Sequence, residues 1–176
     1  AVIPMLATRP LQRIKKACND DWTQASQDDI DNAFYGPYEQ AKEALRDNEF
    51  DVVIGSSMGG AILTKLSQDG IWDGPTVYCA PAHKLLLGGA TGTNDHDCDP
   101  RSPKTGMAIW IHGIHDDVVD VGDSVDACRK ANGHVFIVDD DHRLTSITET
   151  GILDTAIAMA TNRCISWSSS SVPASI

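Results

Sequence analysis

The stretch "DVVIGSSMGGAILTKLSQDG", residues 51–70, passes from one pattern of side chains to another within a few positions. Residues 51–55 form a short apolar run rich in β-branched residues, which predicts a strand buried on both faces. Residues 58–70 carry apolar side chains at helical spacing and end at Gly70, a residue that often terminates a helix. The stretch therefore predicts a strand, a tight turn and a helix in direct succession.

The same alternation continues along most of the chain. Further strands are predicted at 1–6, 75–81, 106–113 and 134–139, and helices at 8–19, 26–48, 123–133 and 148–164. Pro37 is expected to kink or split its helix at Gly36, and Asp123 or Ser124 lies near the start of the helix at 123–133. This pattern predicts an α/β fold with a mostly parallel central sheet and helices on both faces. We expect a single domain over residues 1–164 and a mobile serine-rich tail at 165–176.

Composition excludes several classes of function. The 176 residues have a formal net charge of −11, and an acidic surface repels both nucleic-acid phosphates and anionic membranes. No apolar run is long enough to cross a bilayer, and the first ten residues lack the pattern of a secretory signal, so a cytoplasmic location is expected. The five cysteines are odd in number and form no C-x-x-C pair, which argues against a structural zinc site or a disulfide framework.

The turn after the first of these strands has a chemical interpretation. Gly55, Ser57 and Gly59 fit the pattern G-x-S-x-G, in which a serine nucleophile stands on a strained turn between a strand and a helix. Glycine is expected two positions on either side, because side chains there would collide with the helix. The amide of Met58 would then donate a hydrogen bond to an oxyanion, whereas Ser56 occupies the variable position. The alternative is a plain tight turn in which small residues only permit close packing.

Polar side chains also follow two later strands. Asp116 and Asp117 come after the strand at 106–113, and a carboxylate there could orient an imidazole. His142 follows the strand at 134–139 and could act as a general base. The alternatives are an ordinary turn and a solvated histidine. Since sites of parallel sheets form at the carboxyl ends of strands, these groups are expected to meet Ser57. The chain order Ser, Asp, His is that of the α/β-hydrolases.

Four stretches resemble the small α/β-hydrolase-fold esterases, including compact bacterial hydrolases with little or no cap. They are "VVIGSSMGGAI", "VYCAPAHK", "IWIHGIHDDVVDVGDS" and "VDDDHRL", which lie in family order within residues 51–144. The resemblance implies hydrolysis of carboxylic esters, with a small-molecule ester as substrate and no cofactor. It implies that Asp116 is the acid of the triad and His142 the base, and leaves Asp117 at a turn position.

The sequence departs from this family in one respect. Such enzymes usually begin with a strand and a His-Gly loop that supplies a second oxyanion amide, and no stretch before Ser57 matches it. "AVIPML" resembles the next strand of the family instead. Either the first strand and loop are missing or another segment supplies the donor, and one lost donor costs roughly 100- to 1,000-fold in rate. A non-catalytic or weakly active binding protein with this fold is therefore an alternative.

The long irregular stretch at 84–104 is expected to contribute to substrate binding. Leu85, Leu86 and Leu87 could line a pocket for an acyl or alcohol group, or could pack beneath the loop. His83 could face the same pocket, or could be a packed, hydrogen-bonded histidine. With little room for a cap, the site is expected to be shallow and to favour short acyl chains.

A metal-dependent hydrolase is the other alternative. The candidate ligands are histidines and aspartates near strand ends: His96, Asp97, His112, His115, Asp116, Asp117 and residues 139–142. They show no tight ligand spacing such as H-E-x-x-H, so no metal is expected. The oligomeric state is left open by the sequence.

Overall fold

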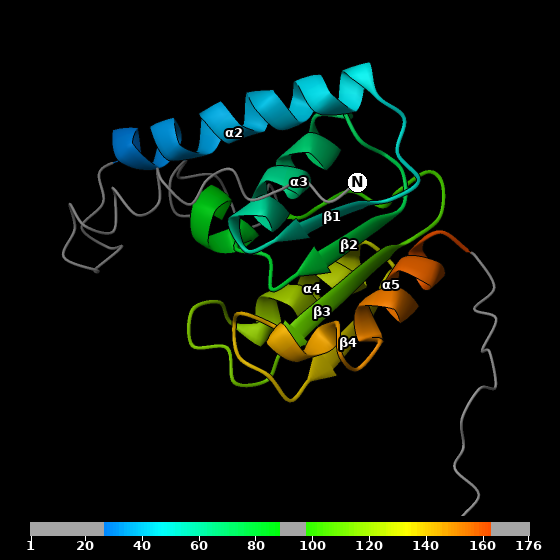
Figure 1. Cartoon of the computed structure of the whole chain (residues 1–176). Helices are drawn as coiled ribbons and strands as arrows, with labels where there is room; N and C mark the ends of the chain where they lie inside the picture. Colours follow the sequence, from blue (N-terminus) through cyan, green and yellow to red (C-terminus); the bar gives the residue numbers. More distant parts are fainter. Residues whose placement is uncertain (1–26, 89–97, 163–176) are drawn as a thin grey trace, which may run out of the picture.

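The computed structural model of the chain describes residues 27–88 and 98–162 (Figure 1). The strands are β1 (Val53–Ser56), β2 (Thr76–Cys79), β3 (Ala108–Gly113) and β4 (His134–Val138). The helices are α2 (Gln27–Asp47), α3 (Met58–Gln68), α4 (Val121–Lys130) and α5 (Ile152–Ala160), with a π-helical segment η2 (Lys84–Gly88) and a 3-10 turn η4 (Thr145–Ile147). The strand predicted at 1–6, the helix predicted at 8–19 and the predicted tail lie outside the described residues.

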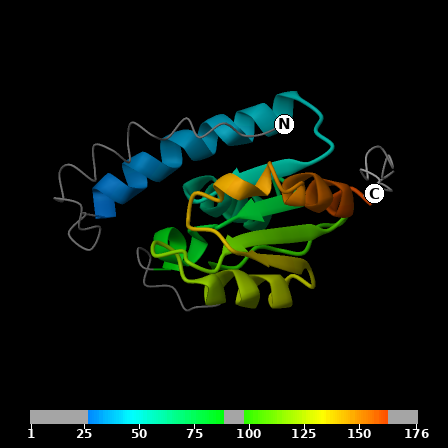
Figure 2. The ribbon, with the colours of Figure 1, turned by 60° about the horizontal axis from the view of Figure 1, so that its bottom comes forward.

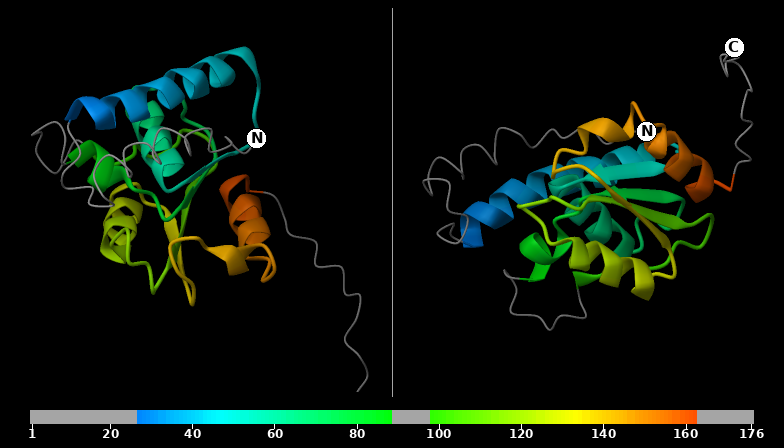
Figure 3. Two further views of the ribbon diagram at one scale, coloured as in Figure 1. Left: turned by 60° about the vertical axis from the view of Figure 1, so that its left-hand side comes forward. Right: turned by 90° about the horizontal axis from the view of Figure 1, so that it is seen from below.

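The four strands form one parallel sheet in the order β1-β2-β3-β4. The register pairs Ser56 with Cys79, Cys79 with Ile111, and Gly113 with Val138, so the carboxyl ends of the strands lie along one edge. Helices cover both faces, with α5 on one side and α3 and α4 on the other (Figure 3). The predicted α/β class is confirmed, and the segments that follow the strands are brought to one edge of the sheet.

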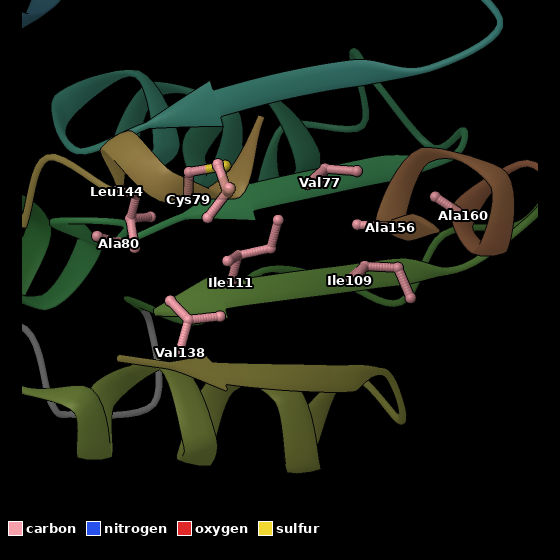
Figure 4. Packing of buried hydrophobic residues seen from close by; sticks show 10 residues of the cluster. Val77, Cys79, Ala80, Ile109, Ile111, Val138, Leu144, Ala156 and Ala160 are labelled. Atoms are coloured by element: carbon pink, nitrogen blue, oxygen red, sulfur yellow. The ribbon is translucent and has the colours of Figure 1, made fainter. Parts of the chain in front are cut away.

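The face of the sheet toward α5 is built from alternate residues of the strands. Val77, Cys79, Ile109 and Ile111 point to this side and are almost fully buried, and Ala156 of α5 packs on them (Figure 4). Small side chains on α5 let the helix approach the branched side chains of the strands closely. Burial of such side chains contributes roughly 1.5–3 kcal/mol each to folding.

The opposite face carries the intervening residues. Tyr78 and Trp110 stack there with ring centroids 4.9 Å apart and an interplanar angle of 20°. Val53 lies in the same cluster, and Leu63 of α3 and Ala127 of α4 cover it. Because β2 and β3 are buried on both faces, their sequences are nearly continuous apolar runs.

Helix α2 lies outside α3 and runs across it (Figure 2). It continues through Pro37, so the predicted split at Gly36 does not occur. Phe34, Tyr38 and Ala41 lie on both sides of the proline and pack into one cluster with α3, which holds the helix together. Tyr38 also donates a 2.6 Å hydrogen bond to Asp69 just beyond α3.

Two further details differ from the sequence prediction. Helix α4 begins at Val121, two residues before the predicted range, because the carboxylate of Asp120 caps it by accepting the Gly122 amide at 2.7 Å, and Asp123 lies in its first turn as predicted. Strand β4 was expected to be buried on both faces, but four of its five residues are exposed or half-buried. The exposure follows from its place at the edge of the described sheet, which its apolar composition does not reveal.

Within residues 27–88 and 98–162, no helix combines the length and apolar character needed to span a bilayer.

Candidate active site

Ser57 stands on the turn between β1 and α3 in a strained conformation. Its φ of 50° and ψ of −116° are unusual for a residue with a side chain. Its amide donates to the Cys79 carbonyl at 2.9 Å, and its carbonyl accepts the amides of Gly60 and Ala82, each at 3.0 Å. These bonds clamp the backbone to β2 and to the first turn of α3, and they leave the hydroxyl partly exposed.

Of the two glycines expected to be required around the turn, Gly55 is required and Gly59 is not. A β-carbon on Gly55 would lie 2.6 Å from the Gly59 carbonyl oxygen, so Gly55 is needed for the close approach of α3. A β-carbon on Gly59 would meet nothing within 4 Å, whereas one on Gly60 would lie 2.6 Å from the Pro81 side chain. The expectation that Gly59 prevents a collision was therefore wrong. Gly60, which packs the helix against Pro81 just after β2, was missed, and its signal was the doubled glycine.

Asp116 follows β3 in a tight turn in which its amide donates to the Gly113 carbonyl at 3.2 Å. Its Oδ1 accepts the amides of Val118 at 2.8 Å and Val119 at 2.9 Å. The side chain is only 1% exposed. Burial by itself raises the pKa of this carboxyl, but the hydrogen bonds from Val119, His142 and Val118 outweigh it and hold the pKa below 3.8. Asp116 is therefore ionised at neutral pH.

The loop after β4 carries His142 to the same edge of the sheet. Just before it, Asp140 accepts hydrogen bonds from the Ser146 hydroxyl at 2.7 Å and amide at 2.8 Å, which lowers the pKa of the Asp140 carboxyl. Just after it, Leu144 is buried in the core beneath α5. His142 is thus anchored on both sides.

Gly113, at the end of β3, permits the contact between these two loops. A β-carbon there would lie 2.3 Å from the Asp140 carbonyl oxygen. The sequence analysis did not single out this residue, although its signal was a glycine placed directly before the acidic turn.

The three predicted side chains lie in one continuous chain of hydrogen bonds. His142 Nε2 is 2.9 Å from Ser57 Oγ, and His142 Nδ1 is 2.7 Å from Asp116 Oδ2. Because ionised Asp116 only accepts hydrogen bonds, Nδ1 carries the proton and Nε2 accepts from the serine hydroxyl. This arrangement can remove a proton from Ser57 and stabilise the imidazolium that results. Asp117 is exposed beside the turn.

Met58 is the first residue of α3, and no described group accepts a hydrogen bond from its amide. An unpaired amide at a helix N-terminus beside the serine suits a developing negative charge. Its side chain is buried against α2. Residues 27–56, which are described and precede the turn, contain no His-Gly loop to supply a second donor.

The residues expected to bind substrate differ in their exposure to solvent. Leu85 is 50% exposed on η2, whereas Leu86 and Leu87 are half-buried and pack against the cluster of α2 and α3. His83 is fully buried, with Nδ1 donating to the Pro81 carbonyl at 3.1 Å, so it offers no surface for a substrate to touch. Burial lowers the pKa of His83. Its position agrees with the alternative that His83 is a packed, hydrogen-bonded histidine.

The candidate metal ligands are dispersed. His115 pairs with Asp139 at 2.8 Å on the surface, and both nitrogens of His112 lie on protein oxygens. His96 and Asp97 lie outside the described residues. In the part of the chain that the structure describes, no three histidines, cysteines or carboxylates are grouped to hold a metal ion. Burial raises the pKa of the Cys79 thiol to about 12, which leaves it protonated and unreactive.

Sequence comparisons find no family model and no curated protein that matches the chain. Solved structures do match. A protein of Xanthomonas campestris pv. campestris, described as a hydrolase of the α/β superfamily, is 20% identical with a TM-score of 0.57, and the match covers 79% of this chain and 70% of that one. A protein of Thermoplasma acidophilum, described as a CIB-like hydrolase, is 19% identical with a TM-score of 0.51, over 79% of this chain and 61% of that one.

At these identities the likeness concerns the fold. It agrees with the parallel sheet and with the helices on both of its faces. The chain has the α/β-hydrolase fold.

Proposed function

We propose that this protein is a serine hydrolase that cleaves carboxylic esters through an acyl-enzyme. The observation that carries the proposal is the unbroken hydrogen-bond chain from Ser57 through His142 to Asp116 on a strained turn. Strain at a non-glycine residue is retained where the surrounding structure enforces it, and it is common at catalytic groups. The fold of the chain supports hydrolase chemistry in general.

In this mechanism His142 takes the proton of Ser57 while Oγ forms a bond to the ester carbonyl carbon. The amide of Met58 donates to the oxyanion of the tetrahedral intermediate. The bond from carbon to the alcohol oxygen then breaks, and His142 returns the proton to that oxygen. Water attacks the acyl-enzyme with His142 again acting as base, which releases the acid and restores the serine hydroxyl.

The preferred substrates are proposed to be short-chain esters, because the triad is open to solvent. His142 keeps 18% of its side chain exposed. The hollow of about 370 Å³ formed by residues 116–121, three aspartates and three valines, is lined by neither Ser57 nor His142 and is not taken as an acyl pocket. A long acyl chain bound at an open site buries less apolar area than one in an enclosed pocket, and so gains little over a short chain.

Hydrolysis of p-nitrophenyl acetate, butyrate and decanoate tests the proposal. We expect acetate and butyrate to turn over faster than decanoate, and Ser57→Ala to lose on the order of 10⁴-fold or more in rate. Ser56→Ala is the matched control, because the exposed neighbouring hydroxyl does not take part. Full activity in Ser57→Ala would contradict the serine mechanism, and faster turnover of decanoate would contradict the short-chain preference.

A binding protein without hydrolase activity is a second candidate. It is favoured by one observation, that Met58 supplies the single oxyanion amide assigned among residues 27–88 and 98–162. In that case the wild-type chain hydrolyses none of the three esters above the rate of Ser57→Ala.

A further inference from the structure

His112 is a fully buried histidine in β3 that the proposed mechanism does not use. A buried imidazole is costly unless both of its nitrogens find partners. Its Nδ1 lies 2.7 Å from the Ser124 hydroxyl of α4, and its Nε2 lies 3.1 Å from the Val119 carbonyl oxygen. Nε2 also lies 3.1 Å from Asp116 Oδ2. The ring therefore joins β3, α4 and the acidic turn.

These distances fix where the ring proton lies. Nε2 faces two oxygens, of Val119 and of ionised Asp116, that can only accept, so Nε2 must carry the proton. Nδ1 of the neutral ring then accepts from the hydroxyl of Ser124, which is free to rotate toward it. Ser124 is itself fully buried, so water does not compete for this bond.

Asp116 Oδ2 consequently lies between two imidazoles. His142 donates to it on one side at 2.7 Å, and Nε2 of His112, whose proton is hydrogen-bonded to the Val119 carbonyl, lies 3.1 Å from it on the other. Each ring accepts a serine hydroxyl at its far nitrogen, Ser57 for His142 and Ser124 for His112. The chain of groups is thus Ser57, His142, Asp116, His112, Ser124.

We propose that His112 is a positioning residue that holds Asp116 Oδ2 toward His142. The N–H of His112 also offsets part of the negative charge of Asp116, so that the carboxylate attracts the His142 ring less strongly. The proposal rests on the proposed function. The two backbone amides already hold Oδ1, so His112 fixes the remaining freedom of the carboxylate, its rotation about the bond to the carboxyl carbon. Ser124 acts one step further out, by donating to Nδ1 and so satisfying the tautomer that the oxygens at Nε2 select.

His112→Asn and His112→Gln separate this role from packing. The asparagine amide is too short to reach Asp116 but can still meet Ser124, whereas the glutamine amide can place a donor near the position of Nε2. We expect His112→Asn to lower kcat roughly 10- to 100-fold with little change in KM. With one donor lost, Asp116 supports a positive charge on His142 more strongly. The acid limb of the pH profile of kcat/KM should therefore move to higher pH.

His112→Gln should restore most of the rate and return the acid limb toward the wild-type position. Thr76→Val is the matched control, since Thr76 is a buried polar residue at the other end of neighbouring β2. It should reduce stability without moving the acid limb. An unchanged pH profile in a folded His112→Asn protein would overturn the positioning role.

The tautomer is measured on the wild-type chain, so this test depends on neither the variants' folding nor their activity. Long-range ¹H–¹⁵N NMR spectra of ¹⁵N-histidine-labelled protein should show His112 protonated at Nε2 and hydrogen-bonded but unprotonated at Nδ1. A proton on Nδ1 with a bare Nε2 would overturn the proposal, because the ring would then donate to Ser124 and not to Asp116. Absence of ester hydrolysis would contradict the proposed function and leave this assignment standing.

Discussion

Replacing the two glycines of the G-x-S-x-G pattern by alanine should have opposite effects on stability. In Gly55→Ala the new methyl group would lie 2.6 to 2.9 Å from three backbone atoms of Gly59 and Gly60, none of which belongs to a flexible side chain. Such overpacking costs roughly 1–3 kcal/mol, and the rigid backbone on the other side favours the upper half of that range. For a chain of this length the melting temperature should fall by roughly 4–12 °C.

In Gly59→Ala the methyl group meets nothing within 4 Å, and the residue lies in the first turn of α3. Alanine favours a helix over glycine by up to about 1 kcal/mol, so this variant should be as stable as wild type or slightly more so. Gly60→Ala, which would collide with Pro81, should behave like Gly55→Ala. Urea and thermal unfolding followed by far-UV circular dichroism measure all three. Equal destabilisation of Gly55→Ala and Gly59→Ala would refute the packing argument.

Two other substitutions give distinct outcomes. Asp116→Asn should lower kcat by roughly 10⁴-fold, because the asparagine amide no longer stabilises the charged imidazole of His142. The pKa of Asp116 is lower in the folded state than its ordinary 3.8, so its stabilisation is present above that value and is lost as pH falls through the folded pKa. The difference in unfolding free energy between wild type and Asp116→Asn, measured with urea, should thus be largest near neutral pH and should shrink below about pH 4. A difference that grows on acidification would contradict this. Tyr38→Phe removes the 2.6 Å hydrogen bond to Asp69 and should cost roughly 1–3 kcal/mol in unfolding free energy while leaving kcat unchanged, since the bond joins α2 to α3 away from the triad. A loss of kcat without a loss of stability would contradict that assignment.

The parts of the fold that the sequence predicted are those set by local pattern. The buried strand, the turn at Ser57 and the helix ending at Gly70 follow one another within 20 residues, and Gly70 has the positive φ of 69° that suits a helix terminus. Because parallel strands place their carboxyl ends at one edge, the sequence order also predicted that Ser57, Asp116 and His142 would be close. The distances among them required the structure.

What the sequence did not predict depends on neighbours that are distant along the chain. The apolar composition of β4 resembles that of β2, and only its edge position leaves Ile137 43% exposed. Gly60 and Gly113 are needed because Pro81 and Asp140 approach them from other segments. His112 was considered only as a metal ligand, since nothing in its own strand indicates the contact with Ser124, 12 residues later.

Labelling with a fluorophosphonate tests the central claim, that Ser57 is an activated nucleophile, most directly. Intact-mass and peptide measurements should find one adduct per chain, on Ser57, in wild type and in Ser56→Ala. The adduct should be absent from Ser57→Ala and should form much more slowly in Asp116→Asn. An adduct that persists in Ser57→Ala, or a wild-type chain that takes up no label, would contradict the account.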